Sequence, residues 1–361
     1  MGENFGGEYD VIIVGAGPAG LSFAKSISNV GLKIAVIEKA AENSITNPAY
    51  DGREIALNHE AVSLLRTLGA WQHLPENSIS LIRKAKVFDG KSSYSLNFDF
   101  RDTNKNTLGY IVSNHEIKRT LYKTLEAVSN VTVIYDTEVA SAAITSDEAH
   151  VILSDGSRFT SKLLVAADSR FSAIRRDVGI GAYMNDFGRT AIVCQITHDA
   201  PHYDTAYEYF QYGRTLAVLP LEGNMSSIVV TLPTDAAETL LNLGKSAFTA
   251  DIQGRLKNQF GKMKLVSERF SYPLVGVFSK KFTAHRFALI GDAAVGMHPV
   301  TAHGFNLGIK GQNTLTKEIK SALLCGLDIG NISFLNKYGK AHQRLSRPIY
   351  EGTNALVKLY T

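Results

Sequence analysis

The feature that most constrains the fold is a glycine-rich turn close to the N-terminus. The apolar run YDVIIV precedes Gly15, Gly17 and Gly20, a helical stretch follows, and a second apolar run, LKIAVIE, ends on Glu38. This spacing is typical of a dinucleotide-binding βαβ unit, whose glycines allow a tight turn, the approach of a pyrophosphate and close packing of helix on strand. Glu38 is placed to accept the hydroxyls of a ribose, which disfavours a 2′-phosphate. The turn predicts a parallel sheet and leaves FAD and NAD open as ligands; a βαβ unit without a ligand is the alternative.

Two later segments also place an acid directly after an apolar run. Asp168 follows a strand in VAADSRFSAIRR, and Arg175 lies further on in the next helix. Asp292 follows a strand in FALIGDAAVGMHPVTAHGFNLGIK, and a helix begins near Asn306. An acid at a strand end can bind a sugar-like hydroxyl, and a helix N-terminus attracts negative charge. Each segment has a structural alternative: Asp168 as a helix cap beside an exposed Arg175, and an ordinary turn at Asp292.

Arg53 lies close in sequence to the glycine-rich turn. It stands in DGREIAL, which we expect to lead directly into the helix NHEAVSLLRTLGAW. An arginine directly before a helix can clamp a diphosphate through its planar fork of donors. An arginine on the protein surface is the alternative.

The strand pattern divides the chain into two domains. Alternating strands flank the turn at Asp89-Gly90, and residues 191–233 read as antiparallel strands rich in Tyr, Phe and β-branched residues. This aromatic sheet is either core or a wall for an apolar substrate. We expect an α/β fold with a Rossmann-like nucleotide-binding domain and an inserted, mostly antiparallel β-sheet substrate domain. The nucleotide-binding domain would cover residues 1–75, 108–182 and 280–361, and the substrate domain residues 76–107 and 183–279.

Composition excludes several classes of protein. A formal charge of +4 over 361 residues, without a basic run, argues against nucleic acid as a partner. The two cysteines, Cys194 and Cys325, lie in apolar surroundings and are expected to be buried free thiols of a reducing compartment. His298 and His303 have no third ligand in register, so no metal site is expected. Without a signal peptide or a long apolar run, the chain is expected to be soluble and cytoplasmic.

Together, the Gly15–Gly20 turn with Glu38, the Asp168 segment and the Asp292 segment resemble the single-component FAD-dependent aromatic hydroxylases of the p-hydroxybenzoate hydroxylase type. The similarity is closest to the ubiquinone-biosynthesis hydroxylases and runs from about Tyr9 to Tyr360, including Arg53. It implies hydroxylation of a hydrophobic phenol or quinol, plausibly a ubiquinone precursor, by O2 through a flavin hydroperoxide. A single nucleotide fold implies FAD as the resident cofactor and NAD(P)H as a transient co-substrate.

The resemblance also assigns residues. FAD would be held by Gly15, Gly17, Gly20, Glu38, Arg53, Asn114, Asp168, Asp292, Gly304, Asn306 and Leu307. Of these, Asp292 would bind the ribityl chain, and the helix near Asn306 would stabilise negative charge on the reduced ring. The substrate would contact Tyr212, Leu219 and Pro220. The catalytic candidates are His303, Pro299 and His298.

The chain departs from the family pattern at two turns. Where the family commonly has Pro-x-x-Gly-Gln-Gly, this chain has Ala302 and His303 before Gly304, and Ser169 follows Asp168 in place of the usual glycine. Alanine predicts that position 302 does not need a positive φ. His303 either contacts the substrate hydroxyl or tunes the flavin as a titrating group, or it replaces glutamine as a neutral hydrogen-bonding side chain.

Other functions on the same scaffold stay open. They are an accessory flavoprotein subunit without turnover, a reductase, an epoxidase and a halogenase, although a lone Trp71 argues against the paired-tryptophan signature of halogenases. Peripheral contact with the inner membrane, contact with a ubiquinone-biosynthesis complex, and a homo-oligomer stay open as well. Relatives in the ubiquinone branch usually continue past Tyr360, so the chain is either a short member or a truncated one.

Overall fold

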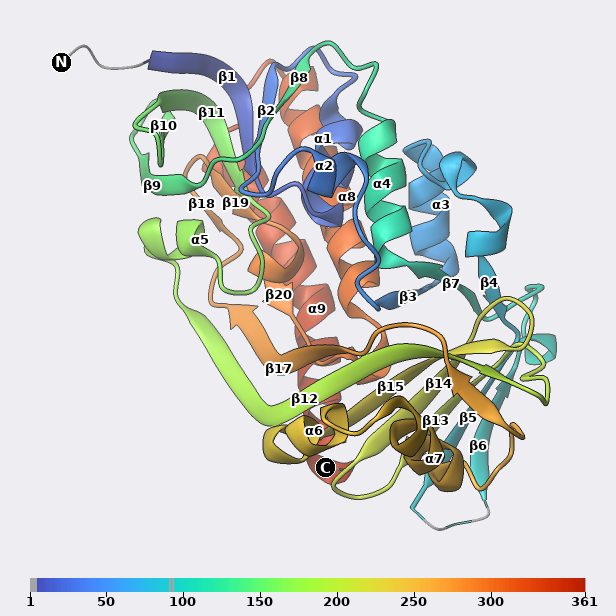
Figure 1. Ribbon diagram of the computed structural model, residues 1–361. Coiled ribbons are helices and arrows are strands. Elements are labelled where there is room, and N and C mark those ends of the chain that lie inside the picture. The colour runs from blue at the N-terminus through green and yellow to red at the C-terminus, as the bar shows by residue number, and fades with distance from the viewer. Residues whose placement is uncertain (1–4, 91, 93, 361) are drawn as a thin grey trace.

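The computed structural model describes residues 5–90, 92 and 94–360 of the chain. Within them, the strands form three sheets: a mostly parallel sheet at the upper left of Figure 1, a large, mostly antiparallel sheet below it, and a small sheet at the right. Most helices lie beside the parallel sheet. The expected fold class, a Rossmann-like unit with an inserted antiparallel sheet, is confirmed.

The first sheet is built around parallel strands. Its members are β1 (Phe5–Val14), β2 (Ile34–Ile37), β8 (Val131–Ile134), β9 (Val139–Ile144), β10 (Ala149–Leu153), β11 (Arg158–Ala166), β18 (Thr283–Ala284) and β19 (Phe287–Leu289). The order is β18-β19-β11-β1-β2-β8, with β10 paired to β11 and to β9. In register, Val14 of β1 pairs with Ile37 and with Ala166, and Ala166 pairs with Leu289. Ile37 also pairs with Ile134 of the parallel strand β8, so five parallel strands end at one edge, where open α/β sheets bind their ligands.

The large sheet supplies a second core and a second face. Its members are β5 (Lys84–Asp89), β6 (Ser95–Asp99), β12 (Ala182–His198), β13 (Thr205–Phe210), β14 (Thr215–Pro220), β15 (Met225–Pro233), β16 (Met263–Leu265), β17 (Phe270–Ser279) and β20 (Val295–Gly296). Alternate residues of β12, β14 and β15, such as Ile192, Val218 and Val230, pack in the core with α6 (Thr234–Leu241) and α7 (Lys245–Arg255). Because side chains alternate along a strand, the intervening residues face the opposite way.

The small sheet joins the two larger ones. It contains β3 (Glu54–Leu57), β4 (Ser80–Ile82) and β7 (Gly109–Ser113) in the order β3-β7-β4. Arg53 therefore precedes a strand, which corrects the expected helix. The helix α3 (His59–Thr67) begins after Asn58, whose side chain accepts a hydrogen bond from the Ala61 amide. β4 lies inside residues 76–107, which were assigned to the substrate domain, but it pairs with β7, which was assigned to the nucleotide-binding domain. The domain boundaries stay a prediction.

The remaining helices cover the parallel sheet. They are α1 (Pro18–Ile27), α2 (Asn43–Thr46), α4 (Asn114–Lys123), α5 (Ala173–Asp177), α8 (Gly304–Leu324) and α9 (Ile332–Tyr360), with short 3-10 turns at Trp71–His73, Glu76–Ser78, Phe100–Asp102, Gly291–Ala293 and Pro299–Thr301. In Figure 1, α9 runs from the parallel sheet down to the large sheet. Tyr338 donates to the carbonyl of Leu289 at one end, and Tyr360 stacks on Phe210 at the other. None of the helices described is long and apolar enough to cross a bilayer.

The two cysteines differ in environment. Cys194 is buried in β12, where burial raises the pKa of its thiol to about 12. Cys325 directly follows the last turn of α8 and is exposed. Both are free thiols, so the expectation of burial is correct for Cys194 and wrong for Cys325.

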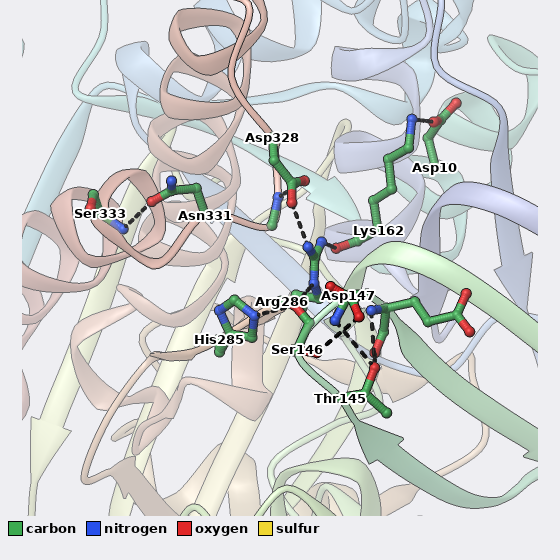
Figure 2. Close-up of polar contacts among 12 residues, drawn as sticks. Asp10, Thr145, Ser146, Asp147, Lys162, His285, Arg286, Asp328, Asn331 and Ser333 are labelled. Carbon is green, nitrogen blue, oxygen red and sulfur yellow. Dashed lines mark hydrogen bonds and ion pairs between the residues drawn. The ribbon is translucent and has the colours of Figure 1, made fainter.

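Arg286 ties three distant segments together, as Figure 2 shows. Its guanidinium donates to the carbonyls of Ser146 at 2.9 Å and Lys162 at 3.0 Å and pairs with Asp328 at 2.6 Å. The side chain is only 9% exposed. These contacts hold the β9–β10 turn, β11 and the α8–α9 loop around the β18–β19 turn.

Replacing Arg286 by methionine is therefore expected to lower the free energy of unfolding by about 3 kcal/mol, because two carbonyls and Asp328 lose the buried guanidinium as their partner. The matched control is Lys162→Met, which removes an ion pair with Asp10 from a side chain that is 58% exposed. An exposed pair contributes at most about 1 kcal/mol. Urea unfolding of both variants measures the difference, and equal losses would contradict the assignment.

Candidate functional site

A cavity of about 940 Å³ lies between the carboxyl edge of the parallel sheet and one face of the large sheet. Its size is in the range of sites that enclose bound cofactors and substrates. The parallel-sheet side contributes Gly15, Gly17, Glu38, Asp168 and Asp292, and the lining also includes residues of β3, of β13 to β15 and of the segment 297–309. Segments far apart in sequence thus meet in one space.

The glycine-rich turn has the geometry that its sequence predicts. Gly15 has a φ of +107°, and a side chain there would meet the carbonyl of Ala167 at 2.5 Å. A Cβ on Gly20, in α1, would lie 1.9 Å from the Gly15 oxygen, so this glycine lets the helix approach the strand. A Cβ on Gly17 would meet nothing within 4 Å. Gly17 therefore leaves open space at the N-terminus of α1, where an anionic group is favoured.

Glu38 is held in place at the end of β2. Its Oε2 accepts from the amide of Ala16 at 2.6 Å and its Oε1 from the amide of Ala40 at 2.9 Å. Each carboxylate oxygen retains a further lone pair for a donor from the cavity. This is the arrangement that ribose recognition needs.

Arg53 and Asn114 converge on Asp51. The Arg53 guanidinium lies 2.5 Å from Asp51 Oδ2, and the buried Asn114 amide donates to the same oxygen at 2.8 Å. Burial raises the pKa of Asp51, but the hydrogen bonds from Arg53 and Asn114 outweigh it and hold that pKa below its usual value. Arg53 and Asn114 both line the cavity, and their contact with the cofactor stays a prediction.

Asp168 combines the two roles that its sequence allows, a helix cap and an acid that faces a ligand. Asp168 Oδ2 caps α5 by accepting from the amides of Ala173 and Ile174. Its Oδ1 is buried and has no partner among the described residues, and burial raises the pKa of the carboxyl. Arg175 is buried rather than exposed, because it donates to the carbonyls of Arg170 and Ala293. Asp168 thus serves as a cap and still offers an oxygen at the cavity.

The loop before α8 is strained where the sequence predicted no strain. Ala302 has φ +52° and ψ 28°, in the left-handed region, so the prediction that this position needs no positive φ is wrong. Asn306 enforces the loop: its side-chain amide donates to the carbonyls of Ala302 and Ala56, and its oxygen accepts from the Asn58 amide. Ser169 also has a positive φ, of 89°. Both turns keep the backbone of a glycine turn without the glycine.

Ala302→Gly is therefore expected to keep or raise the free energy of unfolding, by up to about 1 kcal/mol, because glycine adopts this conformation without strain. Ala302→Val is expected to lower it by about 2 kcal/mol, since a β-branched residue is an outlier there. Chemical denaturation of the two variants tests this. A valine variant as stable as the glycine variant would contradict the left-handed geometry.

Of the histidines in this loop, His298 lines the cavity and His303 lies outside the lining residues. The amide of Val300 donates to His298 Nδ1, so the proton of the neutral ring is on Nε2, which has no partner among the described residues. Burial and nearby Arg189 lower the pKa of His298 to about 4. The ranking of His303 above His298 is therefore corrected. Gly304 and Pro299 also line the cavity, whereas Asn306 and Leu307 brace α8 behind it.

The large sheet forms the opposite wall. Leu219 lies on it, as predicted, but Pro220 is buried on the other face because neighbouring strand residues point in opposite directions. Tyr212 is in the β13–β14 turn, 63% exposed, with its hydroxyl bonded to Asp89. The predictions for Pro220 and Tyr212 are therefore wrong. The wall consists of Glu208, Thr215, Ala217, Leu219, Val229 and Thr231.

Sequence reasoning missed three cavity carboxyls: Glu54, Glu138 and Glu208. Glu54 on β3 accepts from the Ser113 hydroxyl at 2.8 Å and from Gln195 at 3.0 Å, and Tyr50 donates to it at 3.3 Å. Burial raises its pKa. Glu208 lies on β13, and a single acid in the alternating aromatic run TAYEYF was the available signal.

These residues fit FAD. The bare N-terminus of α1 at Gly17 suits a diphosphate, the Glu38 carboxylate suits a ribose, and the unpartnered Asp168 Oδ1 suits a hydroxyl donor. Asp292, held by Arg170 at 2.8 Å, lies at the next strand end. The N-terminus of α8 reaches the same cavity at Gly304.

Comparisons with known proteins agree with this fit. The family model described as FAD binding domain matches residues 8–326. The chain is 46% identical to "Ubiquinone hydroxylase UbiM" of Neisseria meningitidis, over 98% of this chain and 77% of that protein. It is 32% identical to "Ubiquinone hydroxylase UbiL" of Rhodospirillum rubrum, over 98% and 82%. The fold matches the crystal structure of pqsL, a probable FAD-dependent monooxygenase from Pseudomonas aeruginosa, with a TM-score of 0.81 at 17% identity, covering 98% of this chain and 96% of that one.

Proposed function

The chain belongs to the FAD-binding-domain family of flavin-dependent aromatic hydroxylases, and we propose that it hydroxylates the ring of a ubiquinone precursor, using NAD(P)H and O2. The observation that carries the proposal is the continuity of the cavity. One space joins Gly17 and Glu38, at the nucleotide end, to Leu219 and Val229 on the sheet wall. A hydrophobic ring seated on that wall lies within reach of a cofactor bound along the parallel sheet.

The cofactor-binding roles follow from position. Gly15, Gly17 and Gly20 admit the diphosphate, and Glu38 holds the ribose of the ADP half. Arg53 and Asn114 would lie beside the diphosphate and ring, Asp168 and Asp292 would bind hydroxyls of the chain between them, and Gly304, Asn306 and Leu307 would place the N-terminus of α8 against the ring. When bound, FAD supplies electron transfer from NAD(P)H and activation of O2.

The protein's own contribution is electrostatic and steric. The N-terminus of α8 stabilises negative charge on a neighbouring group through its unpaired amides. The apolar wall residues Leu219 and Val229 exclude water from the ring site. His298 is neutral with its proton on Nε2, and this donor has no partner among the described residues, so we assign His298 the positioning of the substrate in place of His303.

A hydrophobic substrate partitions into lipid, so we propose that the protein meets it at the surface of the inner membrane. Sedimentation with lipid vesicles tests this contact. Binding to vesicles is the expected result, and protein that stays in the supernatant at every lipid composition would contradict it.

The proposed activity is tested with purified FAD-loaded protein, NADH or NADPH, and a panel of alkylated phenols. A substrate is expected to speed flavin reduction and to be recovered with one added hydroxyl, with O2 consumed in step. O2 uptake that yields only hydrogen peroxide for every phenol would contradict hydroxylation of this class. Absence of flavin reduction by either nicotinamide would favour an accessory flavoprotein.

A further inference from the structure

Glu208 is an acid on a wall that is otherwise apolar or hydroxylated. Its neighbours on this face are Thr215, Ala217 and Leu219 from β14 and Val229 and Thr231 from β15. Glu208 pairs with Ala217, and Thr215 is two residues along β14, so the Glu208 and Thr215 side chains are diagonal neighbours on the cavity face. The adjacent Tyr207 points into the core on the opposite side. Register thus fixes the Glu208 carboxyl toward the cavity.

The carboxyl has hydrogen-bonding capacity to spare. Its side-chain partner among the described residues is Thr215, whereas a carboxyl offers several acceptor positions and, when protonated, a donor. Burial raises the pKa of Glu208 to about 8, which the bond with Thr215 only partly offsets. At neutral pH it is therefore mostly an uncharged acid that both donates and accepts.

Glu54, another half-buried carboxyl at the cavity, has a structural role. Ser113, Gln195 and Tyr50 all bond to it, and these partners come from the small sheet, the large sheet and the loop before β3. Glu54 therefore joins the sheets. Among the described residues, Glu208 has one side-chain partner, Thr215 of the neighbouring strand β14, so it does not join separate sheets. An acid removed from water with only one partner is costly unless a ligand supplies further hydrogen bonds.

We propose that Glu208 is the residue that recognises an uncharged ring hydroxyl of the substrate. The inference rests on the proposed function and adds to it a substrate requirement. A phenol or quinol hydroxyl directed at the sheet wall both donates to and accepts from the Glu208 carboxyl, while the apolar part of the ring lies on Ala217, Leu219 and Val229. A ring whose hydroxyl is methylated keeps the apolar contact and loses the donor.

Binding by the FAD-loaded protein tests the inference without turnover. The probes are 2-propylphenol and its methyl ether, titrated while the absorbance of the bound flavin is followed. The wild type is expected to bind the phenol about tenfold more tightly than the ether, the usual effect of a hydrogen bond to a buried polar group. Glu208→Leu is expected to bind both compounds equally. Glu208→Gln, which retains a donor and an acceptor, is expected to keep a preference of at least about threefold.

The control is Glu138→Gln, which changes an exposed glutamate at the nucleotide end of the same cavity and is expected to leave the preference unchanged. Glu208→Met, an unbranched alternative, provides the same comparison if the leucine variant does not fold. A preference that survives in the apolar variants, or that is lost in Glu208→Gln, would overturn the role of Glu208 alone. Failure of the wild-type protein to bind either compound would overturn the proposed function together with the inference.

Discussion

Replacing Gly20 by alanine is expected to abolish retention of FAD and to lower the free energy of unfolding by about 3 kcal/mol. A Cβ at this position would lie 1.9 Å from the carbonyl oxygen of Gly15 and 3.4 Å from Ile13. The obstacle is backbone, which cannot rotate away as a side chain can. The start of α1 must therefore move off β1, and this displacement removes the amides at its N-terminus from the cavity.

Gly17→Ala is the matched control for Gly20→Ala, because it adds the same methyl group to another glycine of the same glycine-rich turn. Nothing lies within 4 Å of a Cβ on Gly17, and its φ of −73° suits alanine. Stability without FAD is therefore expected to stay within about 0.5 kcal/mol of wild type, while FAD affinity falls at least about tenfold as the methyl meets the diphosphate. Urea unfolding of the apoprotein and equilibrium dialysis with FAD separate the two effects. Equal stability of both variants would contradict the packing role of Gly20.

Acidification from pH 6.5 to pH 4 is expected to destabilise the protein through two buried histidines. Burial lowers the pKa of His298 and of His342 to about 4, with Arg189 adding to the effect at His298. In the unfolded chain both titrate near 6.5. Below that pH the unfolded state takes up protons that the folded state does not, so stability falls until the folded pKa is reached. Each histidine contributes a loss of about 3 kcal/mol at pH 4.

His342→Met tests the contribution of His342 to this loss of stability. The side chain is 1% exposed, and neither of its ring nitrogens has a partner among the described residues. The variant is expected to lose less stability than wild type over the same pH range, by about 3 kcal/mol. His73→Gln, at an exposed position, serves as the control. Denaturation curves at several pH values supply the measurement, and a variant with the same pH dependence as wild type would contradict the assignment.

The nucleotide half of the site could be predicted because its chemistry is local in sequence. Gly15, Gly17 and Gly20 fix a turn within six residues, and Glu38 ends the next strand, so spacing alone places them together. The aromatic-hydroxylase family and FAD, predicted from these features, are confirmed by the match to the FAD binding domain and by the ubiquinone-hydroxylase relatives, and the α/β fold by the structure. Arg53 and Asn114 also line the cavity as expected.

The substrate half depended on geometry that the sequence does not display. Leu219 and Pro220 were predicted together, although strand alternation allows only one of them to face the cavity. Ala302 was predicted to have an ordinary backbone. That prediction failed because Asn306, four residues away, enforces a left-handed conformation at Ala302. Which of His298 and His303 lines the cavity likewise depends on the path of the loop between β20 and α8.

Glu208 was missed for a related reason. Its strand is recognisable, but which face of a strand meets a cavity depends on how β13 pairs with β14 and β5, which are distant in sequence or joined by a turn. An acid in an aromatic strand is by itself compatible with an exposed edge. Its position on the cavity wall beside Thr215, not its identity, makes it a candidate for substrate recognition.

The central claim is that this chain transfers one oxygen atom from O2 to an aromatic ring. Supplying isotopically labelled O2 to the FAD-loaded protein with NAD(P)H and the phenol that most accelerates flavin reduction tests it directly. The ring product is expected to carry one labelled oxygen atom, and labelled water should contribute none. NAD(P)H oxidation that leaves the ring unlabelled and releases all the labelled oxygen as hydrogen peroxide would contradict the claim.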